Sequence, residues 1–168
     1  MTTKAQPSAQ HRAEALKERV YVTFTGLAVV LALQSHSETL TPGEAASTLA
    51  ITVVGTLLAV FVADFVSHLA VHAKTPSRSE LAHMARTSFG AFGAIVLPLI
   101  FIAVAAMGRW SVETSLRAST VALITALVLI GYLAVRRVKM SWRKKVIVLG
   151  AEFLLGLAVV GLELLAHG

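Results

Sequence analysis

The sequence predicts an all-α integral membrane protein, a bundle of about five transmembrane helices with a cytoplasmic N-terminus and an external C-terminus. Of the 168 residues, 56% are hydrophobic and only 14% are charged, whereas a soluble domain carries about 25% charged residues. The apolar residues also form blocks whose length approaches the roughly 20 residues that a helix needs to cross a bilayer. The placement of Lys and Arg gives the orientation.

The chain divides into a cytoplasmic segment, residues 1–19, and a single transmembrane domain, residues 20–168. Within that domain the five spans are expected at about 20–34, 45–73, 81–107, 118–135 and 146–165. The first span is short. In the third helix, only the later part, from Phe89 onward, is fully apolar. The fourth carries no charge, which favours a position facing lipid.

Local motifs predict where two of these helices begin and where one bends. Thr41 and Glu44 have the spacing of a capping box, and so do Ser77 and Glu80. In such a box each side chain hydrogen-bonds the backbone N–H of the other residue. Pro98 lies inside the third span, where it removes one backbone hydrogen bond and is expected to bend the helix.

Lys and Arg residues lie almost entirely on one predicted side of the membrane. Residues 1–19, the second loop and the fourth loop hold 4, 3 and 6 of them, against 0, 2 and 0 in the first loop, third loop and C-terminus. Because cytoplasmic loops are enriched in Lys and Arg, the first set is assigned to the cytoplasm.

Several classes of function find no support in the sequence. The net charge is +6 and the pI about 10.2, but the basic residues separate apolar blocks and do not form a stripe with aromatics, so no nucleic-acid partner is expected. The chain has no cysteine and hence neither disulfides nor thiolate metal sites. Motifs for a catalytic nucleophile or a phosphate loop are absent, so an enzyme is not the favoured class.

A row of polar side chains runs along the second predicted helix. Asp64, His68 and His72 are four residues apart, and Thr52 and Thr56 continue the row toward the outside. Residues at this spacing lie on one helix face. Charged groups inside a membrane are costly and usually mark an ion pathway or a partner, so this face is a candidate route for cations.

The fifth predicted helix carries Glu152 at a depth that matches Asp64. Asp64 lies roughly 10–15 Å inside the cytoplasmic boundary and Glu152 about 10 Å, at 1.5 Å per residue. If the two carboxyl groups face each other, at least one should be protonated unless a cation lies between them. The alternative is that each pairs structurally with a Lys, Arg or Thr.

A second hypothesis places a divalent metal ion at the cytoplasmic end. Glu80 and His83 have the Glu-x-x-His spacing of metal-binding helical bundles, and Asp64, His68 and His72 would lie nearby. Carboxylate and imidazole suit iron, manganese or zinc. The alternative is that His72, Glu80 and His83 are solvated residues at the membrane surface.

At the outer end, Glu163, Arg109 and Arg117 are candidates for a charged rim. Glu163 lies on the same face of the fifth helix as Glu152, and Arg109 or Arg117 could pair with it, with Glu113 or with Glu44. A solvated rim is the simpler interpretation, since exposed ion pairs contribute little.

The stretch from Glu18 to Gly26 resembles the start of small bacterial homologues of lysosomal potassium channels. Those proteins carry a Phe-Ser-Asp motif in the first helix, whereas this chain reads Phe24-Thr25-Gly26. Because the aspartate is missing, we transfer no property of that family to this chain.

Taken together, the residues favour a small cation channel or transporter for protons or metal ions, acting as a homo-oligomer because one bundle this small has little interior. Two alternatives stay open: an accessory subunit that binds a membrane-protein partner, and an intramembrane metal-binding protein. The compact chain suggests a bacterial plasma membrane.

Overall fold

The computed structural model describes residues 6–136 and 141–167; the side chains of residues 6–12 and of about half of the last helix, including Glu152, Glu163 and His167, lie outside the described part. The elements are all helical there. In chain order they are α1 (Gln6–Gln34), α2 (Pro42–His72), α3 (Arg78–Gly90), the 3-10 segment η1 (Ala91–Ile95), α4 (Val96–Ala106), α5 (Val112–Arg136) and α6 (Trp142–His167).

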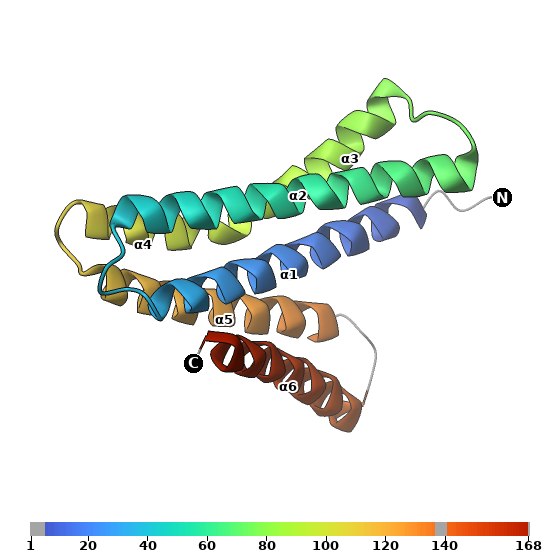
Figure 1. The fold of residues 1–168 in the computed structure, drawn as a ribbon. Coiled ribbons are helices and arrows are strands. Elements are labelled where there is room, and N and C mark those ends of the chain that lie inside the picture. The colour runs from blue at the N-terminus through green and yellow to red at the C-terminus, as the bar shows by residue number, and fades with distance from the viewer. Residues whose placement is uncertain (1–5, 137–140, 168) are drawn as a thin grey trace.

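The helices run back and forth as the alternating topology requires, with α3, η1 and α4 acting as one interrupted helix. The start of α1, the α2–α3 connection, the end of α5 and the start of α6 lie at one end of the bundle, and the end of α6 lies at the other with the α1–α2 loop (Figure 1). We call the first of these the basic end, because it is the end to which the sequence assigns 13 of the 15 Lys and Arg residues.

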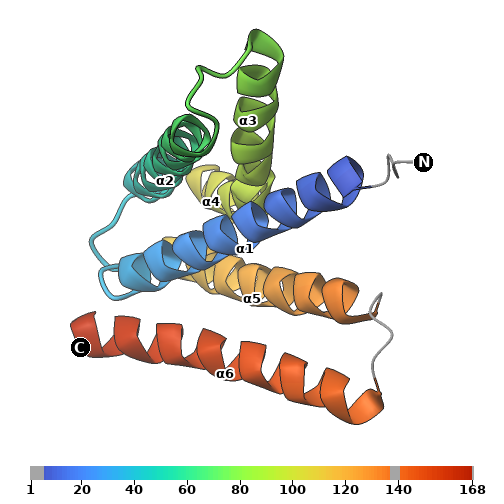
Figure 2. The same ribbon diagram turned by 90° about the vertical axis from the view of Figure 1, so that its right-hand side faces the viewer.

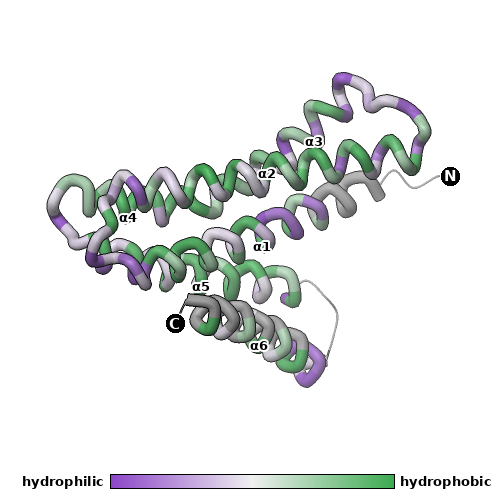
Figure 3. Tube along the Cα trace, viewed as in Figure 1, coloured by the Kyte–Doolittle hydropathy of each residue, from purple (hydrophilic) through white to green (hydrophobic). Residues whose placement is uncertain are grey.

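Among the residues that the structure describes, three helical stretches are long and apolar enough to cross a membrane: Pro42–His72, Arg78–Ala106 and Val112–Arg136. The hydropathy colouring shows α2 as apolar over most of its length, with polar segments at the ends of the bundle (Figure 3). The chain therefore has the character of a membrane protein. The spanning roles predicted for α1 and α6 stay predictions.

The third predicted span is broken in the middle, as Pro98 led us to expect. The 3-10 segment η1 ends at Ile95, and α4 then continues in a different direction from α3 (Figure 2). Pro98 has no N–H to donate, and its ring would clash with the carbonyl of residue 94 in a regular helix. The tighter turns of η1 remove this conflict, so the prediction of a bend is confirmed.

Both predicted capping boxes are also confirmed. The hydroxyl of Thr41 accepts from the backbone N–H of Glu44 while the Glu44 carboxylate accepts from Thr41 N–H at 2.8 Å. Ser77 and Glu80 form the same reciprocal pair at the start of α3, with Ser77 N–H donating to Glu80 Oε2 at 2.7 Å. These bonds satisfy backbone donors that have no partner inside the helix.

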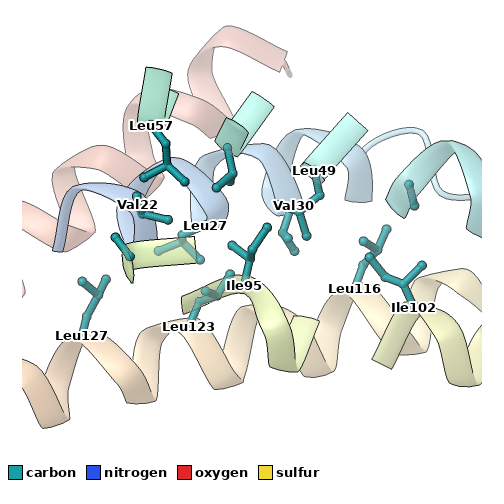
Figure 4. Close-up of a cluster of buried hydrophobic side chains, with 13 residues drawn as sticks. Val22, Leu27, Val30, Leu49, Leu57, Ile95, Ile102, Leu116, Leu123 and Leu127 are labelled. Atoms are coloured by element: carbon teal, nitrogen blue, oxygen red, sulfur yellow. The ribbon is translucent and has the colours of Figure 1, made fainter. Parts of the chain in front are cut away.

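The core lies where α1 packs against α2, η1 and α5, and α4 closes it by packing against α2 and α5 (Figure 2). Buried aliphatic side chains from α1, α2, η1, α4 and α5 fill this region (Figure 4). The closest approach involves Gly26 of α1, where an added Cβ would lie 3.1 Å from Ile95 Cγ2 of η1. The axis of the bundle is thus closed by apolar packing.

The fourth span was expected to be exposed to lipid, and this expectation is wrong for one side of the helix. Helix α5 packs against α1 and α4 and buries a continuous stripe along its length: Ser115, Leu116, Ser119, Leu123, Leu127, Gly131 and Val135. Gln34 at the end of α1 adds a polar link, since its Nε2 donates to Leu116 O at 3.3 Å and to Thr120 Oγ1. The absence of charge did not separate lipid-facing from helix-facing residues, because both surroundings are apolar.

Candidate site: a buried carboxyl pair between α1 and α2

Helix α1 presents one buried face to its neighbours, and this face begins with an acidic residue. Glu18 is 2% exposed, and Val22, Gly26 and Val30 follow it at intervals of four on the same face. The predicted boundary at residue 19 falls inside α1, which runs without a break from Gln6 to Gln34. Glu18 is therefore part of the packed bundle.

The carboxyl group of Glu18 lies beside that of Asp64 on the antiparallel helix α2. The two groups are close enough to interact electrostatically. Glu18 Oε2 is fully covered and has no hydrogen-bond partner of its own. A buried polar atom without a partner costs free energy and needs an explanation.

Two adjacent carboxyl groups cannot both be ionised without strong repulsion, and burial of one of them increases the cost. Lys17 is near enough to act on Glu18 electrostatically, but its own side chain is exposed. Two neighbouring carboxyl groups avoid this repulsion when a proton or another cation neutralises one of them. Such a pair can bind and release a positive charge.

The polar row predicted on α2 is present and lies at the edge of its buried face. Leu49, Val53 and Leu57 are buried, whereas Asp64 and His68 beyond them are only partly covered. Thr52 and Thr56 are also partly covered, and Thr56 Oγ1 donates to Thr52 O at 2.9 Å. The row thus runs from the packed part of α2 to its less covered, basic end.

The two histidines and Glu80 gather at that end. The rings of His68 and His72 lie with their centroids 4.5 Å apart. Glu80 precedes the apolar part of its helix and is fully exposed; hydrogen bonds from the Ser77 hydroxyl and N–H, together with the nearby charges of His68 and His72, hold its pKa below the ordinary value. Glu80 is therefore an anion beside two imidazoles.

The metal hypothesis gains no support from this geometry. Within the part of the chain that the structure describes, no three His, Asp or Glu side chains form a set that could hold a metal ion. Asp64 has Glu18 as its neighbour, and Glu80 is bound by Ser77. His83 is exposed on α3, where its backbone carbonyl accepts from Thr87.

The predicted partner of Asp64, Glu152, lies outside the described side chains. Its helix, α6, packs against α1 and α5, while α2 packs against α1, α3, η1 and α4. Figure 2 shows α6 on the far side of α1 from α2. The carboxyl group that the structure brings to Asp64 is that of Glu18.

The candidate outer rim is only partly described. Arg117 forms an exposed ion pair with Glu113 one turn away on α5, which is one of the pairings considered. Arg109 is exposed in the α4–α5 connection. Glu163 lies outside the described side chains, so its pairing with either arginine stays a prediction.

Glu18 is the residue that the sequence analysis missed, because it was assigned to the segment before the first span. A signal was available: the apolar positions of the first span, extended back one turn with helical spacing, reach Glu18. What the spacing could not supply was the identity of the facing residue. Comparison with protein-family models, with curated proteins and with solved structures gave no match, so the case for a function depends on this chain's own residues.

Proposed function

We propose that the protein is a small cation transporter or channel of a membrane, with protons as the preferred cargo, and that Glu18 and Asp64 form its binding site. The single observation that carries this proposal is the fully covered Glu18 carboxyl group beside Asp64, with one oxygen lacking a partner. Intramembrane carboxyl groups typically belong to ion pathways and proton relays.

The residues around the pair supply a path to one end of the bundle. From Asp64 the row continues through His68 to His72, whose rings are in contact, and imidazole exchanges protons near neutral pH. Toward the other end, Thr56 and Thr52 continue the row. Glu152 belongs to the proposal as a further carboxyl group whose depth matches that of Asp64.

We further propose that the working unit is a homo-oligomer, in a bacterial plasma membrane. The axis between α1, α2, α4 and α5 is filled by buried aliphatic side chains (Figure 4), which leaves no room there for an ion with its hydration shell. A route for the cation then runs along the partly covered side of α2 that bears the polar row, and a second copy of the chain would enclose this route.

The test is proton flux into liposomes that contain the purified chain, driven by a potassium diffusion potential. Glu18→Gln and Asp64→Asn remove the exchangeable charge while preserving shape, and each should reduce the flux to that of empty liposomes. Glu152→Gln tests the wider pathway. Glu44→Gln is the matched control: its carboxylate is exposed at the opposite end, and glutamine also serves in a capping box.

Full flux in both Glu18→Gln and Asp64→Asn would overturn the assignment. Absence of flux from the unaltered chain, together with a stoichiometric larger partner in native membranes, would instead support an accessory subunit in which the charges only hold helices together. Size-exclusion profiles of the variants show whether each still folds and assembles.

A further inference from the structure

A hollow of about 340 Å³ lies between α1 and α3 at the basic end of the bundle. Its floor consists of small residues, Ala15 of α1 with Gly90 and Ala91 at the α3–η1 junction. A Cβ added at Gly90 would meet nothing within 4 Å. The hollow therefore exists because these small residues leave the space between the two helices unfilled.

The walls of the hollow are basic and polar. Arg19 lines it from α1, and Arg86, His83 and Thr87 line it from α3. Both arginines are exposed. The ion pair found among the described side chains joins Arg117 to a different residue, so neither guanidinium in the hollow is neutralised there.

Two of the acidic residues near these arginines in sequence are engaged elsewhere. Glu18, adjacent to Arg19, is buried and interacts with Asp64. Glu80, two turns before Arg86, accepts hydrogen bonds from Ser77. Two arginines, one from each helix, thus line one open space.

The position along the helices matches the phosphate layer of a bilayer. Arg19 immediately precedes the apolar stretch that begins at Val20, and Arg86 stands three residues before Phe89, where the apolar part of the third span begins. The sequence assigns this end to the cytoplasmic leaflet, whose anionic lipids attract basic groups. Guanidinium groups bind phosphate through paired, charge-assisted hydrogen bonds.

We propose that this hollow binds a phosphate group, with Arg19 and Arg86 as its two ligands from α1 and α3. The group is either the headgroup phosphate of an anionic phospholipid or a free phosphate anion; the recognition chemistry is the same. Occupancy neutralises both arginines and links α1 to α3. This inference stands apart from ion transport and does not require it.

The experiment measures binding of dioleoyl phosphatidic acid, dioleoyl phosphatidylcholine and inorganic phosphate to the purified full chain in neutral detergent. Native mass spectrometry counts bound lipid, and calorimetry follows inorganic phosphate. Arg19→Gln and Arg86→Gln should each weaken phosphatidic acid binding about tenfold, the loss expected for one charge-assisted hydrogen-bonded contact. Arg109→Gln removes an exposed arginine from the α4–α5 connection at the other end and should leave binding unchanged.

The same measurements distinguish a lipid headgroup from a free phosphate anion as the source of the phosphate group. Binding of phosphatidic acid alone identifies a lipid site, while competition by inorganic phosphate identifies a site for the anion itself, and either result supports the proposal. Equal affinity for phosphatidic acid and phosphatidylcholine overturns it. So does equal binding by the unaltered chain and both hollow variants, or a matching loss in Arg109→Gln.

Discussion

Glu18 of α1 and Asp64 of α2 come from different helices, yet their carboxyl groups lie near enough to repel each other electrostatically. Glu18 is nearly completely covered. Such an arrangement weakens a fold, since burying like charges costs free energy. The proposed function gives this costly arrangement a use, the binding of a proton or another cation.

The cost of the pair leads to a prediction about stability. Glu18→Gln should raise the free energy of unfolding by about 1 kcal/mol, because the amide N–H₂ donates to the Asp64 carboxylate and repels nothing. The gain should be largest at alkaline pH, where the carboxyl pair is most repulsive, and should shrink on acidification, when a protonated Glu18 can itself donate. Unfolding of the protein in mixed micelles at several pH values provides the measurement.

Glu14→Gln is the matched control for this change, because Glu14 lies one turn earlier on α1 and is partly exposed. Its replacement should alter stability little at any pH. If Glu18→Gln instead destabilises the protein at alkaline pH, the two carboxyl groups are not in repulsive contact and the proposed site loses its basis.

The capping box of α3 leads to a second prediction, about titration. Hydrogen bonds from the Ser77 hydroxyl and N–H lower the pKa of Glu80 from its ordinary value of 4.5. A lowered folded-state pKa means that this contribution to stability is complete above pH 4.5 and is lost as the pH falls through the lower, folded-state value. Carbon-detected NMR of the Glu80 carboxyl group in micelles gives the titration directly.

In Ser77→Ala the pKa of Glu80 should move back toward 4.5, since the side-chain hydrogen bond is the largest cause of the shift. Ser111→Ala offers the comparison, because Ser111 accepts from Thr114 N–H at the other end of the bundle. An unchanged titration of Glu80 in Ser77→Ala would show that the Ser77 hydroxyl is not what lowers its pKa.

Packing at Gly26 leads to a third prediction. Gly55→Ala on α2 should stabilise the protein by about 0.5–1 kcal/mol, because alanine favours helix over glycine and a Cβ there meets nothing within 4 Å. Gly26→Ala should lose this gain, since its Cβ would lie 3.1 Å from Ile95 Cγ2. Parallel unfolding curves of the two variants give the comparison, and equal stabilisation would contradict the close contact of α1 with η1.

Much of the local structure followed from short-range rules. The capping residues Thr41 and Ser77 mark helix starts because a hydroxyl satisfies a backbone donor wherever the helix later packs. Pro98 interrupts the third span for an equally local reason, the missing N–H and the bulk of its ring. Neither prediction needed knowledge of a neighbouring helix.

Which side of each helix packs against protein could not be predicted from such local rules. The fourth span has no charge, yet α5 buries Leu116 and Leu123 against other helices while Val121 and Val128 stay outside. In a membrane, lipid and protein interior are both apolar, so hydrophobicity does not distinguish the two faces. Asp64 could be recognised as costly, but its partner could not be chosen among the available carboxyl groups.

The sequence by itself determined the class of protein, the ends of several helices and the row from Thr52 to His72, because backbone geometry and the length of an apolar helix depend on nearby residues only. Tertiary structure alone decided that α1, rather than α6, lies against the second half of α2. That choice brings Glu18 to Asp64 and sets Arg19 beside Arg86, since contacts between helices depend on how their side chains pack.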